Sequence, residues 1–439
     1  MDKTERDLRT DRIISIIAIA VILFTAATSC APKRSNTLAT AGPPATITGL
    51  DPHLTAQQLN LQYDTIEQWK LPFDSLYLKE SQLPDAVVYL PAPPDTTSPI
   101  FREDYRRWLW GKTIRPTQRG KQASLESLFG IVRMATIYSD VLGLTIHPQT
   151  TPAIYQFMLY VGETAHMSTI HAKQTYMRVR PFARANEQVW GEFDYDELRN
   201  DGSYPSGHTA LAWATSLAMV EVAPQLQDTI LRRGYQYGES RVIVGAHWQS
   251  DVYAGYLVAS AAVAAMHNNP RFIAHLKAAQ EEYNRLTVNR NLLTTNKNGT
   301  SFSLPHDGKI LDTLLIKKDG YTERYHWAGK NKTAEEKLFA MASEEMQRSK
   351  YAFIQPDVNW AFALIASEIE PRNQDLLLRR GYDYGANSKE PTDLIQARRI
   401  LASAVVASLH NNPKFTALLA KAKAYHQGLH SYSPNSLYF

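Results

Sequence analysis

Apolar side chains recur every three to four positions through most of the stretch from residue 101 to residue 286. This spacing matches one face of an α-helix. It predicts helices over 124–143, 152–175, 208–222, 226–243 and 249–266. No run alternates between apolar and polar positions as a half-buried strand does. The pattern therefore predicts an all-α fold.

A short apolar run near the N-terminus differs from these helices in its surroundings. Residues 13–27 are apolar, follow a polar segment that ends at Arg12, and stop just before the single cysteine, Cys30. At about 15 residues the run is shorter than a membrane span and is typical of the apolar region of a signal peptide. The sequence Ala27-Thr28-Ser29-Cys30 resembles the end of a bacterial lipoprotein signal, in which the cysteine is lipidated.

The N-terminal pattern predicts a bacterial protein that is exported. We expect a lipoprotein-type signal peptide over 1–30, lipidation of Cys30, and a periplasmic or outer-membrane-tethered protein whose only membrane contact is this anchor. An ordinary secretory signal or an uncleaved anchor is the alternative, and both also lead to export. With one cysteine, the chain has no intramolecular disulfide and must rely on its core.

Changes in composition mark the remaining boundaries. Ala, Pro, Thr and Ser predominate after Cys30, which predicts a flexible tether over 31–65. The helical pattern then predicts a main domain over 66–286, entered through a Pro-rich extended segment at 84–99. A cluster of Asn, Thr, Lys and Gly predicts a linker or insertion over 287–335.

The C-terminal part repeats the sequence of the main domain. LRRGYQYG at 231–238 returns as LRRGYDYG at 378–385, and ASAAVAAMHNNPRF at 259–272 returns as ASAVVASLHNNPKF at 402–415. Trp213, Glu221 and Pro224 correspond to Trp360, Glu368 and Pro371. Such self-similarity indicates a duplicated structural unit. We therefore predict that 336–439 is a degenerate, partial copy of the main domain.

Three polar segments of the main domain carry candidate chemistry. The first holds Lys173 and Arg180, followed by Pro181; the second is Pro205-Ser206-Gly207-His208; the third is 240-SRVIVGAHWQSD-251. Lys173, Arg180 and, in the third segment, Arg241 supply three positive charges that suit the oxygens of a phosphoryl group. Ser206 and Gly207 open a predicted helix, where backbone N–H groups favour an anion. His208 lies beside them and can give a proton to a leaving oxygen.

The third segment adds a candidate nucleophile. His247 and Asp251 are four residues apart, so a helix places them on one face. The carboxylate can then fix the tautomer of the imidazole and leave its other nitrogen as a nucleophile. Each segment alone has a simpler explanation, since Ser206 can be an ordinary helix cap and a His–Asp pair is more often structural. No single structural need explains three cations, two histidines and a helix start together.

Together these motifs resemble the signature of the type 2 phosphatidic acid phosphatase (PAP2) and vanadium haloperoxidase superfamily. The flanking sequences YMRVRPF, GSYPSGHTALAWA and RRGYQYGESRVIVGAHWQSDV are most similar to bacterial class A nonspecific acid phosphatases. The resemblance covers about 77–286 and implies a helical-bundle phosphatase that acts on phosphorylated small molecules, needs no metal or other cofactor, and is inhibited by vanadate.

The resemblance also implies a role for each signature residue. His247 would form a phosphohistidine, Asp251 would orient it, and His208 would act as general acid and then general base. The phosphate would be held by five residues, namely Lys173, Arg180, Ser206, Gly207 and Arg241. At the positions of Pro205–His208 the C-terminal copy has Ala352, Phe353, Ile354 and Gln355. It is therefore expected to be catalytically dead, and to form either an intramolecular pseudo-dimer or a tethered accessory domain.

Other functions stay open at this stage. A vanadium-dependent haloperoxidase would use the same anion pocket, and so would a phosphatase of lipid or isoprenoid pyrophosphates. A non-catalytic phosphate-binding protein fits the C-terminal copy better than residues 101–286. The formal net charge of +4 is too small to indicate a nucleic-acid partner. A homo-oligomer is the alternative to the pseudo-dimer.

Overall fold

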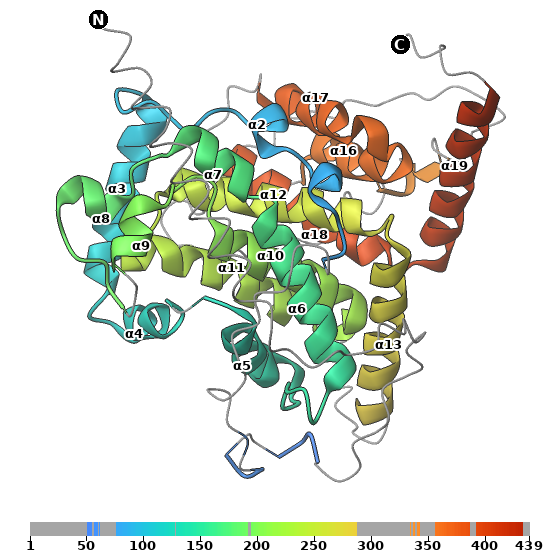
Figure 1. The fold of residues 1–439 in the computed structure, drawn as a ribbon, viewed down its shortest axis with the longest axis horizontal. Coiled ribbons are helices and arrows are strands. Elements are labelled where there is room, and N and C mark those ends of the chain that lie inside the picture. Colours follow the sequence, from blue (N-terminus) through green and yellow to red (C-terminus); the bar gives the residue numbers. More distant parts are fainter. Residues whose placement is uncertain are drawn as a thin grey trace, which may run out of the picture. The chain divides into compact units, whose positions relative to one another are not determined.

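The computed structural model describes residues 51–54, 57–59, 61, 76–127, 129–191, 195–287, 334, 337–338, 340–342, 356–386 and 392–432. These residues form a series of helices without a strand among them (Figure 1). The prediction of an all-α fold is therefore confirmed. The predicted signal peptide, Cys30, most of the tether and most of the linker lie outside the described residues, as do Ala352, Phe353, Ile354 and Gln355.

Four long helices form the centre of the main domain. They are α6 (Pro152–Met167), α10 (Gly207–Val222), α11 (Gln227–Val244) and α12 (Gln249–Met266). Helix α10 packs against the other three and is buried along almost its whole length (Figure 1). Its alternating small residues let neighbours approach closely, while side chains such as Trp213 and Leu217 fill the core. Each large apolar side chain buried in this way contributes about 1.5–3 kcal/mol.

Shorter helices surround this centre. They are η2 (Glu80–Gln82), α2 (Ala86–Tyr89), α3 (Pro99–Ile114), α4 (Gln118–Leu125), α5 (Ile131–Leu142), α7 (Ile170–Tyr176), α8 (Pro181–Ala185), α9 (Tyr195–Asn200), η3 (Pro224–Leu226) and α13 (Pro270–Thr287). The single turn of α2 interrupts the segment that was predicted to be extended. Its cause is local, because the Asp85 carboxylate accepts from the Val87 N–H and caps the turn.

Two of the five predicted helices are broken in the structure. The helix expected over 124–143 ends at Leu125, and α5 begins only after Gly130, whose φ of 118° is a conformation that favours glycine. The helix expected over 152–175 is divided between α6 and α7. There the Thr169 hydroxyl donates to the His166 carbonyl at 2.7 Å and competes with the helical backbone.

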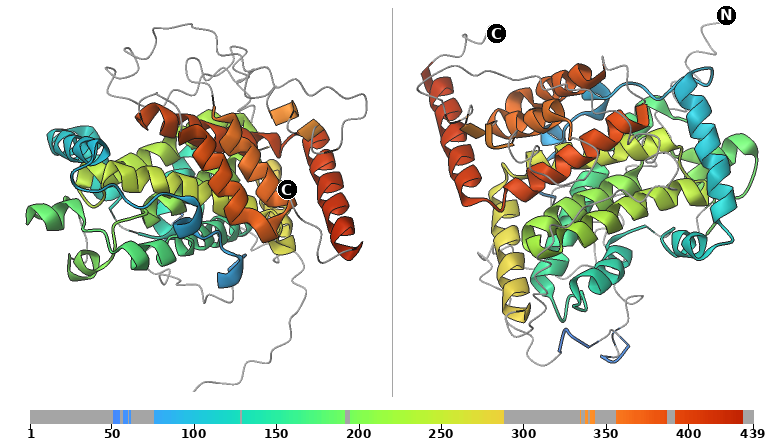
Figure 2. Two further views of the ribbon diagram at one scale, coloured as in Figure 1. Left: turned by 90° about the horizontal axis from the view of Figure 1, so that it is seen from above. Right: turned by 180° about the vertical axis from the view of Figure 1, so that it is seen from behind.

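The C-terminal part forms a second group of helices. It contains α16 (Val358–Ile369), η4 (Pro371–Asn373), α17 (Gln374–Ala386), α18 (Thr392–Leu409) and α19 (Pro413–Tyr432). Helix α16 packs on α12, and α18 packs on both α10 and α12. Figure 2 shows these orange and red helices beside the yellow-green helices of the main domain. None of the described helices is long and apolar enough to cross a membrane.

A buried His–Glu pair makes the stability of this group dependent on pH. His410 Nε2 lies 3.2 Å from Glu368 Oε1, and Lys423 lies 3.4 Å from Glu368 Oε2. Burial lowers the pKa of His410, but the neighbouring carboxylates of Glu368 and Glu221 outweigh it and raise the pKa to about 9. Because this folded-state pKa exceeds the unfolded value of about 6.5, the stabilisation is complete below pH 6.5 and disappears as the pH rises through 9.

We therefore expect the free energy of unfolding to fall by about 3 kcal/mol between pH 6.5 and 9. Thermal melts across this range measure it, and His410→Gln should flatten the dependence. His171→Gln is the matched control, since His171 is exposed. An unchanged slope in His410→Gln would contradict the assignment.

Candidate active site

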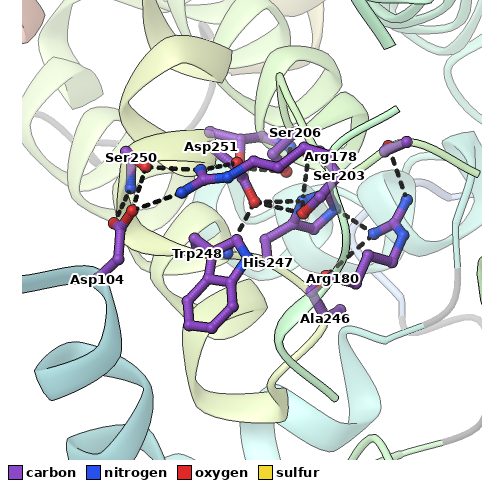
Figure 3. Close-up of polar contacts among 12 residues, drawn as sticks. Asp104, Arg178, Arg180, Ser203, Ser206, Ala246, His247, Trp248, Ser250 and Asp251 are labelled. Atoms are coloured by element: carbon purple, nitrogen blue, oxygen red, sulfur yellow. Dashed lines mark hydrogen bonds and ion pairs between the residues drawn. The ribbon is translucent and has the colours of Figure 1, made fainter. Parts of the chain in front are cut away.

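Three segments that are far apart in the sequence meet at one end of α10 and α12. Lys173 lies on α7, and Arg180 immediately precedes α8. Ser206 caps α10, and His247 lies in the turn between α11 and α12. Left-handed residues make two of these turns, Met177 (φ 40°) after α7 and Gly245 (φ 82°) after α11. The predicted site residues are therefore placed by helix ends. Figure 3 shows Arg180, Ser206, His247 and Asp251 among their hydrogen-bonding partners.

The ring of His247 is held at both nitrogens. Its Nδ1 lies 2.8 Å from the Ser203 carbonyl, and its Nε2 lies 2.9 Å from Arg180 Nη1. A carbonyl only accepts and a guanidinium only donates, so the proton is on Nδ1 and the lone pair is on Nε2. Burial, followed by the positive charges of Arg180 and Lys173, lowers the pKa of His247 well below its usual value. The imidazole is thus neutral, with a nucleophilic nitrogen that faces the cations.

Asp251 lies behind this ring, but it is not the nearest partner of Nδ1. Its Oδ2 is 3.5 Å from His247 Nδ1, farther than the Ser203 carbonyl. The same Oδ2 accepts from the Ser203 hydroxyl and from the Trp248 N–H, the latter at 2.8 Å. The His247–Asp251 pair expected from the i, i+4 spacing is therefore present, but its distance is longer than that between His247 Nδ1 and the Ser203 carbonyl. Ser203 supplies the short contact, and this residue was missed by the sequence analysis.

A buried arginine, also absent from the predicted site, fixes the other side of Asp251. Arg178 Nη1 bonds to Asp251 Oδ1 at 2.5 Å, and Arg178 Nη2 bonds to Asp104 Oδ2 at 2.8 Å (Figure 3). Ser250 joins the network, since its N–H and hydroxyl both donate to Asp104. The side chains of Asp104 and Asp251 are 2% and 0% exposed, so Arg178 compensates two carboxylates that are removed from water.

Lys173 and Arg180, the first two cations of the predicted motifs, share the carboxylate of Asp201. Lys173 Nζ and Arg180 Nη2 lie 2.8 Å and 2.6 Å from Asp201 Oδ2. Burial alone would raise the pKa of Asp201, but Lys173 and Arg180 outweigh it and hold that pKa below its usual value. Burial lowers the pKa of Lys173 to about 8. Because the Asp201 side chain is 44% exposed while both cations are buried, Asp201 is the member of this group that is open to replacement by an anion.

The start of α10 has the form of a capped helix. Ser206 Oγ accepts from the Thr209 N–H at 3.3 Å, so this serine acts as an ordinary helix cap in the structure. Gly207 has a separate steric reason. A Cβ at this position would lie 2.7 Å from Cδ2 of His166, so no larger residue fits without displacing that ring. The cap is therefore compatible with an anion role for the first N–H groups of α10.

His208 and Arg241 meet at one backbone carbonyl. His208 Nε2 lies 3.1 Å from the Ser127 carbonyl, and Arg241 Nη1 lies 3.4 Å from the same oxygen. Phe129 packs edge-on against His208, with ring centroids 4.7 Å apart. Burial, then the charges of Arg241 and His247, lowers the pKa of His208 well below its usual value. Backbone hydrogen bonds join the two halves of the site, since the His247 N–H donates to the Arg241 carbonyl at 3.2 Å and the Ser206 N–H donates to the Asp251 carbonyl at 3.0 Å.

The structure thus brings together all eight residues predicted from the motifs. It adds four that the sequence analysis missed, which are Asp104, Arg178, Asp201 and Ser203. Two of the four lie within quoted motifs, since Arg178 is part of YMRVRPF and Ser203 is part of GSYPSGHTALAWA. Asp104 and Asp201 carry no sequence signal of their own.

Comparison with known proteins agrees with this geometry. The model of the PAP2 superfamily matches residues 153–273, which include the three signature segments. The non-specific acid phosphatase of Providencia stuartii is 42% identical over 214 residues, which are 48% of this chain and 86% of that protein. The non-specific acid phosphatase of Salmonella typhi is 39% identical over 199 residues, covering 45% of this chain and 79% of that protein.

A more distant relative extends the same similarity. The acid phosphatase of Zymomonas mobilis is 30% identical over 198 residues, which cover 45% of this chain and 75% of that protein. The similarity therefore spans most of each relative but only about half of this chain. On these grounds the chain belongs to the PAP2 superfamily and is an acid phosphatase, a phosphoric monoester hydrolase.

Proposed function

We propose that the enzyme hydrolyses phosphate monoesters in two steps through a phosphohistidine on His247. One observation carries this proposal. Nδ1 of His247 is bound to the Ser203 carbonyl, so the lone pair of Nε2 points toward the Arg180 guanidinium, where a phosphate would bind. A neutral, oriented imidazole among cations is suited to attack phosphorus.

Both steps balance with the residues in place. In the first, the Nε2–P bond forms, the bond from phosphorus to the leaving oxygen breaks, and His208 gives its proton to that oxygen. In the second, water attacks phosphorus, the N–P bond breaks, and His208 takes the proton from the water. Asp251 stabilises the positive charge that develops on His247, from 3.5 Å.

The phosphate oxygens take over the contacts of the exposed carboxylate. Lys173 and Arg180 exchange Asp201 for the substrate, while Arg241 and the first N–H groups of α10 bind the remaining oxygens. The positive charge needed in the transition state comes from these residues, so the proposal requires no metal, and a chelator should leave the activity unchanged. Vanadate, which mimics the trigonal-bipyramidal transition state, should inhibit tightly.

The depressed pKa of His208 indicates how its proton arrives. Burial and the cations keep His208 neutral in the resting site. A phosphate dianion adds negative charge beside it and favours the protonated form. A substrate that enters as the monoanion, with a second pKa near about 6, brings the required proton with it. This explains why the enzyme should work best under acidic conditions.

Partition between two acceptors tests the covalent intermediate. A series of aryl phosphates is hydrolysed in the presence of a fixed concentration of an alcohol, and the ratio of alkyl phosphate to inorganic phosphate is measured. A common phosphoenzyme gives one ratio for every leaving group, because all substrates pass through the same species. A ratio that changes with the leaving group would show direct attack by water and exclude the intermediate.

His208→Ala tests the general acid. Aryl phosphates with good leaving groups should lose little activity, while alkyl phosphates should lose about 10²–10⁴-fold, because they depend on protonation. The readout is the slope of log kcat/KM against the pKa of the leaving group, which should become steeper in the variant. An equal loss for all leaving groups would assign His208 to phosphate binding instead.

We also propose that the enzyme is exported and held at a membrane by a lipid on Cys30. The support is the apolar run at 13–27 that ends just before this cysteine. Cys30→Ser should abolish incorporation of a radiolabelled fatty acid and move the activity to the soluble periplasmic fraction. Unchanged labelling in Cys30→Ser would exclude this site.

A further inference from the structure

The two helical groups follow the same order of elements. In the main domain α10 is followed by η3, α11, α12 and α13, and in the C-terminal part α16 is followed by η4, α17, α18 and α19. Both short 3-10 helices begin with proline, at Pro224 and Pro371, and both final helices do too, at Pro270 and Pro413. The repeated sequence therefore corresponds to repeated elements.

The contacts between the two groups are reciprocal. Helix α10 packs on α18, α16 packs on α12, and α12 packs on α18. If α10 is exchanged with α16 and α12 with α18, the first contact becomes the second and the third becomes itself. This is the pattern of an isologous interface, in which the same surface is used twice around a two-fold axis.

Equivalent residues meet at the centre of this interface. The rings of His267 and His410, which open the two HNNP motifs, are stacked with centroids 3.9 Å apart. The Nδ1 of each ring lies 2.9 Å from the carbonyl four residues earlier. The Nε2 of each ring faces a buried glutamate, Glu221 at 3.1 Å or Glu368 at 3.2 Å. A residue that packs against its own counterpart marks the position of the axis.

The interface is apolar around this pair and is part of both cores. Ile400 and Leu401 of α18 belong to the same buried cluster as α10 of the main domain. Leu257 and Ala261 of α12 belong to the cluster that is centred on α16. Polar contacts also cross it, since Trp213 Nε1 donates to Ser403 Oγ at 3.1 Å. Such a continuous apolar core resembles a permanent interface.

We propose that the C-terminal part is a permanent internal partner, which occupies the surface of α10 and α12 that a second copy of the main domain would otherwise occupy. The protein is then a monomer with one active site for two helical groups. The partner also supports catalysis, because α10 carries His208 at its start and α12 carries Asp251 in its first turn. Helix α18 packs on both of these helices, and α16 packs on α12.

Cysteine placement at the axis tests this proposal in the full chain with Cys30→Ser. In a homodimer built on this surface, His267 would face His267 of the second copy, so His267→Cys alone would give a disulfide-linked dimer. An internal partner predicts no such dimer. It predicts instead that His267→Cys with His410→Cys forms a disulfide within one chain, seen as faster migration on a non-reducing gel at monomer mass.

Two further measurements do not depend on how these variants fold. Light scattering of the unmodified chain should give the mass of one chain. Gln227 and Ser408, whose side chains lie 3.0 Å apart and are only partly buried, offer a milder pair. Gln227→Cys with Ser408→Cys should be joined within one chain by a short bismaleimide, and either single variant should not. A dimeric mass, a linked dimer from His267→Cys, or the absence of cross-linking in folded, active double variants would overturn the proposal.

Discussion

His247→Ala in the full chain is expected to hydrolyse aryl phosphates about 10⁴–10⁶-fold more slowly than the unmodified protein, as with other nucleophilic residues that act as part of a unit. The reason is geometric. Nε2 of His247 carries the lone pair that faces Arg180, whereas Nε2 of His208 is hydrogen-bonded to the Ser127 carbonyl. The other acceptors that Arg180 contacts among the described residues are the Asp201 carboxylate and three backbone carbonyls, and none of them can replace an imidazole nitrogen as nucleophile.

His247→Asn separates loss of chemistry from loss of structure. Its amide can still donate toward the Ser203 carbonyl, but it supplies no nucleophile. We expect a melting temperature near that of the unmodified chain, together with the same loss of kcat. His275→Asn is a suitable control, because that histidine on α13 contacts Tyr77, outside the site. Activity within tenfold of the unmodified enzyme in a folded His247→Asn would refute the nucleophile assignment.

The sequence predicted the central helices well because their ends are chemically marked. Helix α10 follows a capping serine, and α11 ends at Gly245, whose left-handed conformation no ordinary residue adopts easily. The break at Glu126 was missed because it depends on tertiary contacts. The Glu126 carboxylate turns to bind Arg233 and Ser240, an interaction that no local pattern reveals.

The same distinction explains the active site. Residues that would touch phosphate lie in short motifs whose spacing reflects the chemistry, so they were predicted directly. Residues that hold those groups in place were missed, because their importance follows from what they contact after folding. Arg178 reads as one more cation beside Arg180, yet it points to two carboxylates behind the site. Asp104 comes from α3, about 75 residues earlier, where a lone aspartate in a helix has no distinguishing context.

Arg178→Met is expected to lower the free energy of unfolding by about 3–5 kcal/mol and kcat by about 10²-fold. Burial lowers the pKa of Arg178, but Asp251 and Asp104 outweigh it and raise that pKa, so the guanidinium is charged. Loss of the guanidinium leaves the buried carboxylates of Asp104 and Asp251 without the positive charge that compensates them. The KM should change little, because Arg178 contacts Asp251 and Asp104 and none of the predicted phosphate ligands.

Adding Asp104→Asn to Arg178→Met distinguishes a positioning role from a structural one. The amide removes one of the two uncompensated charges and keeps acceptor capacity for Ser250, so part of the lost stability should return. The kcat should not return, because Asp251 Oδ1 still lacks the donor that fixes its orientation relative to His247. Urea unfolding and steady-state kinetics on the single and double variants measure the two effects separately. If kcat recovers in proportion to stability, Arg178 acts only on the fold, and the orientation of Asp251 does not depend on it.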